Sequence, residues 1–319
     1  MSDLERIAKI VAKELANFEQ EYSKQLHSSV ELANSVGKHL DSHKGKMIRP
    51  LLTMLSAGAS KGIVEDHIVH MSVALELLHN SSLIHDDVVD NSDLRRGMPT
   101  INSYLGNKVA VLCGDLYLAK VMTLLCNYAN PAEMSVVNRT AVEMSEGELL
   151  QQQTSRTQNF DKKNYISTID KKTASLMAAC CEIGSIGENT SEVSRRLRDF
   201  GLHYGRAFQM HDDMLDYMPT AQTGKPYGND IQERRITLPL ICMLQQASST
   251  RRDAIMEILH RDTIDEVFAT QIVAEVADSN ALSVVQQHID QEKQLALEQL
   301  SELSPSEYKD GLQEMVRML

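Results

Sequence analysis

The chain has 319 residues, of which 42% are hydrophobic and 24% are charged, so it can bury a sizeable core as one large domain or two small ones. Its 32 Lys and Arg residues are outnumbered by 44 Asp and Glu residues, and the net charge of −12 argues against non-specific nucleic-acid binding, which needs a positive surface. An anionic substrate would therefore have to be held by a local cluster of cations.

The hydrophobic pattern predicts an all-α protein. Apolar residues recur at spacings of three and four, and no stretch between the Gly and Pro residues shows the alternation of a strand. No linker or low-complexity tract divides the chain, so a single helical domain over residues 1–319 is the default expectation. Helices are expected over residues 3–24, 27–40, 47–59, 64–91, 105–128, 131–153, 161–186, 191–218, 236–247, 249–260, 263–274, 277–302 and 305–318.

The N-terminal segment is acidic and amphipathic, and it lacks the basic start and apolar core of a signal peptide, which predicts a cytoplasmic location. The longest apolar stretch, residues 109–129, is interrupted by Asp115 and Lys120, so we expect a buried helix with no stable insertion into a membrane. The five Cys residues show no Cys-x-x-Cys and no zinc-binding spacing, which indicates buried, reduced thiols.

Two cations stand at the start of the helix predicted over residues 47–59. Lys46 and Arg49 are three residues apart in Gly-Lys-Met-Ile-Arg-Pro, on an opening turn whose dipole favours anions. Taken singly, such a cation is more often a solvated surface charge. Lys46 and Arg49 are candidate anion-binding residues here because the sequence also contains other cations next to Asp-rich motifs.

The dominant feature is a repeat: His-Asp-Asp-x-x-Asp occurs at residues 85–90 and again at residues 211–216. In each copy the first and last Asp are four residues apart, so on a helix they share one face, where two like charges are destabilising. A cation should compensate them. Carboxylates are hard oxygen ligands, and two facing sets suit Mg²⁺, which leaves other positions to water and substrate phosphates.

A loop containing cations follows each Asp-rich helix end. Residues 95–100 include Arg95 and Arg96, and residues 223–230 include Lys225. If the carboxylates hold Mg²⁺, these cations can supply the remaining charge to a diphosphate, and Arg offers bidentate donors. Metals and cations together would then stabilise a leaving pyrophosphate.

These segments closely resemble the trans-isoprenyl diphosphate synthases, the polyprenyl synthetase family. The first Asp motif lies in Glu-Leu-Leu-His-x-x-Ser-Leu-Ile-His-Asp-Asp-x-x-Asp at residues 76–90, followed by Leu-Arg-Arg-Gly-x-Pro-Thr at residues 94–100. The second is followed by Gly-Lys-Pro-x-Gly-x-Asp at residues 224–230. The resemblance covers roughly residues 45–241 and is strongest to medium- and long-chain members such as heptaprenyl, octaprenyl and solanesyl diphosphate synthases.

The resemblance implies an orthogonal helical bundle of the isoprenoid synthase type around a central cavity, and a homodimer. It implies a Mg²⁺-dependent prenyltransferase that condenses isopentenyl diphosphate with an allylic diphosphate, farnesyl or geranylgeranyl diphosphate. About three Mg²⁺ ions per site are expected: Asp86 and Asp90 would hold two and Asp212 a third, with supporting or water-mediated roles for Asp87, Asp213 and Asp216.

The same resemblance implies roles for the other polar residues. Those expected to grip the allylic diphosphate are Arg95, Lys172, Lys225 and Arg235, and those expected to bind isopentenyl diphosphate are Lys46, Arg49, His79 and Arg96. Thr173 and Gln209 would lie close to the reacting carbons and help to stabilise the carbocation. The sequence departs from the family at Met47, where a basic residue is common, and at Arg235, where the family often has Lys.

The resemblance also implies that the residues before the first Asp motif determine product length. Ser81 and Ser82 stand where short-chain members of the family have bulky aromatic residues, so two small side chains imply an open tunnel and a product of about C30 to C50, of the kind used for quinone side chains. Met122 and Met144 are candidate floor residues, although flexible apolar side chains are equally expected in a plain core. A shorter-chain farnesyl or geranylgeranyl diphosphate synthase is the alternative.

Other classes fit the sequence less well. Glu76-x-x-His79 and Glu257-x-x-His260 have the spacing of a di-iron carboxylate bundle, but that assignment leaves both Asp repeats without a role. A non-catalytic partner subunit is disfavoured because both Asp motifs are intact, and a terpene cyclase is disfavoured because the second motif is a full Asp-Asp-x-x-Asp. No Gly-x-Ser-x-Gly nucleophile motif or Gly-rich nucleotide loop is present in the sequence.

Overall fold

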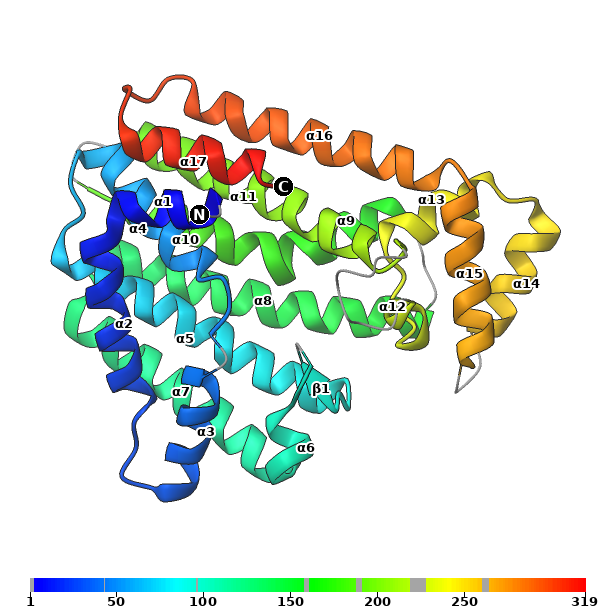
Figure 1. The fold of residues 1–319 in the computed structure, drawn as a ribbon, viewed down its shortest axis with the longest axis horizontal. Coiled ribbons are helices and arrows are strands. Elements are labelled where there is room, and N and C mark those ends of the chain that lie inside the picture. Colours follow the sequence, from blue (N-terminus) through cyan, green and yellow to red (C-terminus); the bar gives the residue numbers. More distant parts are fainter. Residues whose placement is uncertain are drawn as a thin grey trace. The chain divides into compact units, whose positions relative to one another are not determined.

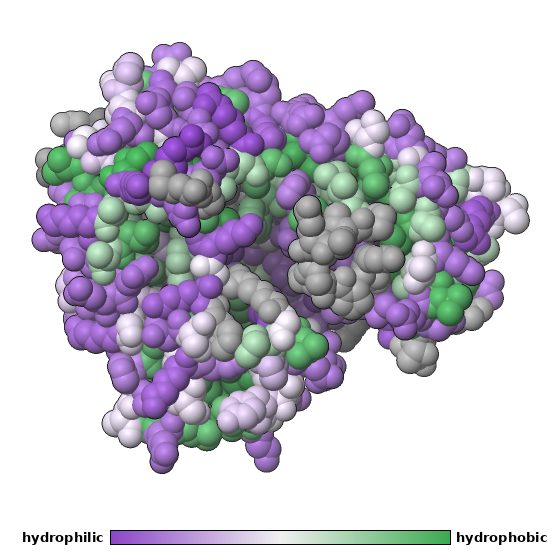
Figure 2. All heavy atoms as spheres, viewed as in Figure 1, coloured by the Kyte–Doolittle hydropathy of each residue, from purple (hydrophilic) through white to green (hydrophobic). Residues whose placement is uncertain are grey.

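A computed structural model describes residues 3–42, 44–95, 97–157, 161–187, 191–218, 228–259 and 264–319. The prediction of an all-α protein is confirmed: across these residues the only strands are two of two residues each, which pair as an antiparallel hairpin (Figure 1). The face shown in Figure 2 is mostly hydrophilic, with hydrophobic residues in smaller patches, as expected for a strongly charged chain.

The chain forms two compact units, which are described separately. Unit 1 comprises residues 1–142, 175–202 and 296–318, and unit 2 comprises residues 143–174 and 203–295 with Leu319. Unit 1 contains α1 (Asp3–Ala8), η1 (Lys9–Val11), α2 (Ala12–Leu26), α3 (Glu31–Ser42), α4 (Ile48–Lys61), α5 (Asp66–Val89), β1 (Leu94–Arg95), β2 (Met98–Pro99), α6 (Ile101–Leu105), α7 (Asn107–Tyr128), α10 (Ser175–Ser185) and α17 (Glu307–Arg317).

Unit 2 contains α9 (Lys162–Ile169), η2 (Asp170–Ala174), α12 (Asn229–Gln232), α13 (Leu238–Gln246), α14 (Ser249–Leu259) and α15 (Glu266–Asp278). Three further helices contribute residues to both units: α8 (Pro131–Thr157), α11 (Ser191–Leu215) and α16 (Ala281–Leu300). The expectation of one domain over residues 1–319 stays a prediction.

α5 is the central helix of unit 1. Its buried residues lie on every side, from Ile68 to Asp87, as expected for a helix surrounded by other helices. α4 packs on α5 and also on α10, where Gly184 permits a close approach: a Cβ there would lie 2.9 Å from the backbone nitrogen of Ala57. This packing of α4 and α10 supports α5, whose last turn carries the first Asp motif.

α7 is buried on one face only. Cys113, Tyr117 and Leu124 are buried, but Leu112 is 67% exposed and Met122 is 57% exposed. Among the described residues, α7 is the one helix long and apolar enough to cross a membrane by length and composition, and 39% of its most apolar window is buried. The expectation of a buried helix therefore holds for the face on α5 and is wrong for the opposite face.

Unit 2 has its own hydrophobic core, built from α9, α11, α12, α13, α14, α15 and α16. Tyr217, Ile231, Leu238 and Ile272 are among its fully buried members. The two helices predicted over residues 263–274 and 277–302 are α15 and α16, with the break displaced to Ser279, whose N–H bonds the carbonyls of the last turn of α15.

Two long predicted helices are interrupted. The helix expected over residues 3–24 breaks at η1 because Val11 leaves the helical region, with φ −122° and ψ 33°. The helix expected over residues 161–186 contains η2, a π-helical turn, whose extra residue rotates the side chains that follow. Gly147 allows the close approach here, since a Cβ at this position would lie 2.6 Å from the backbone nitrogen of Lys172.

Candidate active site

The first Asp motif lies in the last turn of α5, which ends at Val89 with Asp90 as its C-cap. Asp87 is buried and forms a bidentate ion pair with Arg95: Nε donates to Oδ1 at 2.9 Å and Nη2 donates to the same oxygen at 2.7 Å. A carboxylate at a helix C-terminus is unfavourable in the helix dipole, and Arg95 neutralises the most buried carboxylate of the motif. The contact that the sequence predicts between Arg95 and the allylic diphosphate stays a prediction.

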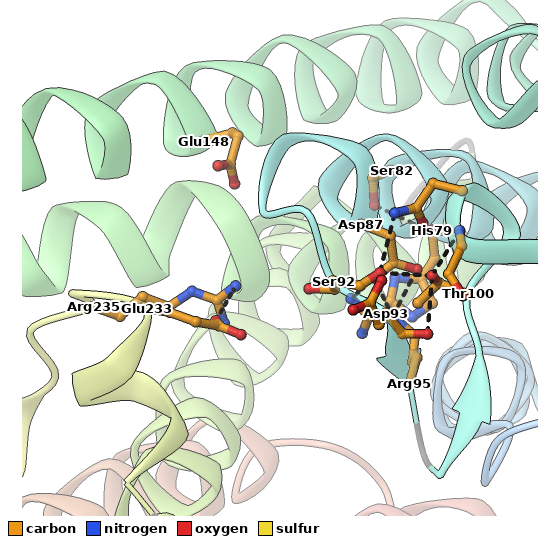
Figure 3. Close-up of polar contacts among 12 residues, drawn as sticks. His79, Ser82, Asp87, Ser92, Asp93, Arg95, Thr100, Glu148, Glu233 and Arg235 are labelled. Carbon is orange, nitrogen blue, oxygen red and sulfur yellow. Dashed lines mark hydrogen bonds and ion pairs between the residues drawn. The ribbon is translucent and has the colours of Figure 1, made fainter. Parts of the chain in front are cut away.

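The hairpin that carries Arg95 is braced against the end of α5. Gly97 has φ +78° in its turn, a conformation that favours glycine. The Ser92 N–H donates to the Asp87 carbonyl at 3.0 Å, and the Thr100 hydroxyl donates to the Ser92 carbonyl at 2.6 Å. Figure 3 shows Asp87, Ser92, Arg95 and Thr100 gathered at this point. Arg96 lies outside the described residues.

Asp86 and Asp90 are four residues apart, so they lie on one face of the end of α5. Among the described residues, no three Asp, Glu, His or Cys side chains converge to hold a metal ion by themselves. Two hard oxygen donors fit a Mg²⁺ or Ca²⁺ ion whose other ligands are water and phosphate, because Mg²⁺ is usually bound by one or two carboxylates and keeps several waters. The donor set therefore fits the predicted ion when a diphosphate completes the ligand shell.

The cations predicted to bind isopentenyl diphosphate lie in unit 1. Lys46 is exposed just before α4, and Arg49 is half-buried in its first turn. Met47, between them, has φ +50° and ψ 39°, a left-handed conformation that is uncommon for this residue type and often accompanies function. His79, in the interior of α5, is half-buried and accepts from the Ser82 hydroxyl through its carbonyl.

The second Asp motif lies in unit 2, at the end of α11. Asp212 is exposed, whereas Asp213 is buried and accepts hydrogen bonds from Tyr165 Oη at 2.6 Å and from Gln209 Nε2 at 2.7 Å. Burial raises the pKa of Asp213 to about 7 although both hydrogen bonds lower it. The exposed Asp212 is therefore suited to bind a cation, and Asp213 is suited to anchor the helix end.

Asp216 accepts hydrogen bonds from the segment at residues 228–230, which follows the second motif in the chain. Its carboxylate accepts from the Asp230 N–H at 3.0 Å, and its carbonyl accepts from the Gly228 N–H at 3.1 Å. Burial and the charges of Asp213 and Asp216 raise the pKa of the Asp230 carboxyl well above its usual range. Lys225 lies outside the described residues, so its predicted contact is not placed.

Thr173 and Gln209, predicted to lie near the reacting carbons, are brought together. Thr173 Oγ1 donates to Gln209 Oε1 at 2.8 Å, and Gln209 in turn donates to Asp213. With Tyr165 on the far side of Asp213, a polar chain joins α9 and η2 to α11. Sequence reasoning missed Tyr165, because a single Tyr in a short helix gives no motif.

Lys172, predicted to bind the allylic diphosphate, makes an ion pair with Glu148 and donates to Gln151 Oε1 at 3.3 Å. Burial alone would raise the pKa of Glu148, but the charge and hydrogen bond of Lys172 outweigh it and lower the pKa. Glu148 therefore stays charged and restrains Lys172, and no motif in the sequence predicts this role. Arg235 pairs with Glu233 at 2.8 Å, as Figure 3 shows.

The predicted chain-length residues differ in their surroundings. Ser81 is 3% exposed, and its hydroxyl donates to the Gly114 carbonyl of α7 at 2.9 Å. Ser82 is half-buried and bonds only within its own helix. Met144 is buried, whereas Met122 is 57% exposed on the face of α7 that carries Leu112. The roles of both residues in setting product length stay predictions.

The chain is similar over most of its length to known prenyl diphosphate synthases. The chain is 34% identical over 309 residues to an all-trans-nonaprenyl-diphosphate synthase (geranyl-diphosphate specific) of Rhodobacter capsulatus, covering 97% of this chain and 94% of the relative. It is 30% identical over 316 residues to the octaprenyl diphosphate synthase of Escherichia coli (strain K12), covering 97% and 96%.

A crystal structure of a polyprenyl synthase from Caulobacter crescentus CB15, complexed with calcium and isoprenyl diphosphate, superposes with a TM-score of 0.93. That protein is 29% identical, and the match covers 98% of this chain and 96% of the other. The likeness confirms the predicted isoprenoid synthase type of fold. The profile of the polyprenyl synthetase family matches residues 30–308, which include both Asp motifs, and the chain therefore belongs to this family.

Proposed function

We propose that this enzyme condenses isopentenyl diphosphate with an allylic diphosphate to make an all-trans polyprenyl diphosphate of about C30 to C50. Its family and its similarity to synthases named for nonaprenyl and octaprenyl products support prenyl chain elongation. The observation that carries the proposal is the chemistry of the two Asp motifs, each of which buries its second Asp in contacts with the protein and places its first Asp at the end of a helix, where a carboxylate can bind a divalent cation.

Asp86, Asp90 and Asp212 are the proposed ligands of about three Mg²⁺ ions. Bound Mg²⁺ would neutralise the diphosphate and favour its departure from the allylic carbon. A neighbour crystallised with calcium and isoprenyl diphosphate supports the use of a divalent cation in this family. Asp87 and Asp213 hold the helix ends that carry these carboxylates.

The cations of the chain would hold the two diphosphates. Lys172, restrained by Glu148, is proposed for the allylic diphosphate, together with Lys225 and Arg235. Lys46, Arg49, His79 and Arg96 are proposed for isopentenyl diphosphate. Arg95 is also proposed for the allylic diphosphate, because its ion pair with the buried Asp87 uses Nε and Nη2 and leaves the Nη1 donors of the guanidinium for a phosphate.

The reaction requires no protein nucleophile. The Thr173 and Gln209 dipoles, fixed by their mutual hydrogen bond, would stabilise the allylic cation while the double bond of isopentenyl diphosphate attacks it. The proton lost from the new carbon chain would pass to the departing pyrophosphate. A di-iron bundle has no support from the relatives, and Glu257-x-x-His260 extends beyond the described residues.

We also propose a homodimer in the cytoplasm. The exposed face of α7 carries Val111, Leu112 and Met122, with exposed fractions of 41%, 67% and 57%. Large apolar side chains exposed together on one helix often mark an interface, so a second copy of the chain is the proposed cover. Light scattering after size exclusion would test it, since a monomer at micromolar concentration would contradict the proposal.

The proposed activity is tested with isopentenyl diphosphate, Mg²⁺ and either farnesyl or geranylgeranyl diphosphate. Products are dephosphorylated and sized by mass spectrometry. A ladder that extends to about C30 to C50 is expected. Products that stop at C15 or C20 with excess isopentenyl diphosphate would replace the proposal with the shorter-chain alternative, and no incorporation at all would refute both.

A further inference from the structure

His85, the residue before the first Asp motif, is seated on α7. α5 and α7 lie side by side in unit 1 (Figure 1). His85 Nε2 lies 3.2 Å from the Val111 carbonyl oxygen and 3.5 Å from Asp115 Oδ1. Both neighbours are acceptors, so Nε2 carries the ring proton and donates a hydrogen bond to α7.

The His85 ring can pack against α7 only because residue 114 is glycine. A Cβ on Gly114 would lie 2.6 Å from Cδ2 and 2.8 Å from Cε1 of the His85 ring, closer than real Cβ atoms approach. One turn earlier on α5, Ser81 donates to the Gly114 carbonyl at 2.9 Å. Ser81 and His85 therefore hold the same point of α7 from two successive turns of α5, and neither contact is possible if the helices separate.

The position of the His85 contact around the axis of α5 bears on the orientation of Asp86 and Asp90. At 3.6 residues per turn, about 100° per residue, Asp86, Asp90 and Asp87 stand about 100°, 140° and 200° around the helix from His85. Asp87 is held by Arg95 of the hairpin. The face that carries Asp86 and Asp90 is thus bounded on one side by the His85 contact with α7 and on the other by the Asp87 ion pair. Two fixed points on either side determine how that face is rotated.

We propose that His85 is a positioning residue for the metal-binding carboxylates of the first motif: its imidazole, seated over Gly114, sets the rotation of the end of α5 and hence the direction of Asp86 and Asp90. The proposal rests on the proposed metal-binding role of those carboxylates. His85 itself binds no substrate, since its Nε2 is turned to α7. Its effect is on the affinity for the divalent cation.

The test compares His85→Ala, His85→Gln, Gly114→Ala and the double variant His85→Ala/Gly114→Ala. Loss of a residue that orients metal ligands typically weakens metal binding by about 10- to 100-fold. In His85→Ala we expect the Mg²⁺ concentration for half-maximal rate to rise at least about tenfold, with the KM for isopentenyl diphosphate within twofold of wild type. His85→Gln keeps an N–H of similar reach and should recover most of the loss.

The glycine provides the specific control. Gly114→Ala should expel the ring and raise the Mg²⁺ requirement as His85→Ala does. In the double variant the ring atoms nearest to the added methyl are absent, so the effect should not exceed that of His85→Ala alone. His27→Ala, which removes a histidine bonded to Asn34 on the surface of unit 1, should leave the Mg²⁺ requirement unchanged.

A second readout does not depend on turnover. The midpoint of thermal unfolding is measured while Mg²⁺ is titrated at a fixed concentration of inorganic pyrophosphate. Ligands that bind only the folded state raise this midpoint, and they raise it more when they bind more tightly. The proposal is supported if the variants rank in the same order of Mg²⁺ requirement in this titration as in the rate measurements. A lower midpoint without any shift in the Mg²⁺ titration, or additive effects of the two substitutions, would overturn it. Failure of the wild-type protein to respond to Mg²⁺ in either assay would instead refute the proposed metal role, and a short product would leave this test intact.

Discussion

Substitution of the two serines before the first Asp motif should separate product length from stability. Ser82→Phe places a large ring four residues before Asp86, about 6 Å along the helix at 1.5 Å per residue. Ser82 is half-buried, and its hydroxyl bonds only the His79 carbonyl of its own helix. We expect Ser82→Phe to shorten the product towards C15 or C20 and to change the free energy of unfolding by no more than ~0.5 kcal/mol.

Ser81→Phe should behave differently. Ser81 is 3% exposed between α5 and α7, and its hydroxyl donates to the Gly114 carbonyl. The lost hydrogen bond is worth about 0.5–1.5 kcal/mol, and overpacking a filled interior costs about 1–3 kcal/mol. Together they should lower the free energy of unfolding by about 2–4 kcal/mol.

The assay pairs product sizing by mass spectrometry with urea unfolding of each variant. Ser135→Phe, at an exposed position of α8, is the matched control and should change neither product length nor stability. If Ser82→Phe makes the same long product as wild type, Ser82 does not border the growing chain. If Ser81→Phe is as stable as wild type, the tight contact between α5 and α7 is wrong.

Three further results are expected. Asp86→Ala and Asp212→Ala should each lower kcat by about 10²–10³, the cost of one preorganised electrostatic contact, and near wild-type turnover of either would contradict their metal-binding role. Arg49→Ala should raise the KM for isopentenyl diphosphate and Lys225→Ala that for the allylic substrate; equal effects of each variant on both substrates, in initial-rate measurements, would refute the division. Leu112→Asp, which puts a charge on the exposed face of α7, should give a monomer by light scattering, and an unchanged dimer would exclude this face as the interface.

The helices and the Asp motifs could be predicted because their signals are local. The spacing of apolar residues is a property of one segment, and each His-Asp-Asp-x-x-Asp copy lies at the end of a helix, as expected. The hairpin could not be predicted in this way, since strands of two residues are too short to alternate. Its position depends on the Gly97 turn and on the ion pair of Arg95 with Asp87, which join separate segments.

Roles that depend on tertiary contacts were also beyond the sequence. A cation beside an Asp motif can serve a diphosphate or a neighbouring carboxylate, and only the structure shows that Arg95 pairs with Asp87. The π-helical turn that carries Lys172 depends on close packing at Gly147. Tyr165 gives no motif, because its importance arises only where it meets Asp213.

The two Asp motifs share a division of roles that explains why each contains three carboxylates. In both copies the second Asp is buried and satisfied by the protein: Asp87 by Arg95, and Asp213 by Tyr165 and Gln209. Each lies in the last turn of a helix, where the dipole opposes a carboxylate, so an unsatisfied one would fray the end. Once the second Asp is fixed in this way, the first and last, four residues apart, share the neighbouring face of the helix. The first copy therefore combines one anchoring carboxylate with a pair on the neighbouring face, whereas the second combines two carboxylates in contact with the protein, Asp213 and Asp216, with the exposed Asp212. Both arrangements give the preorganisation that the proposed binding of a divalent cation and a diphosphate would require.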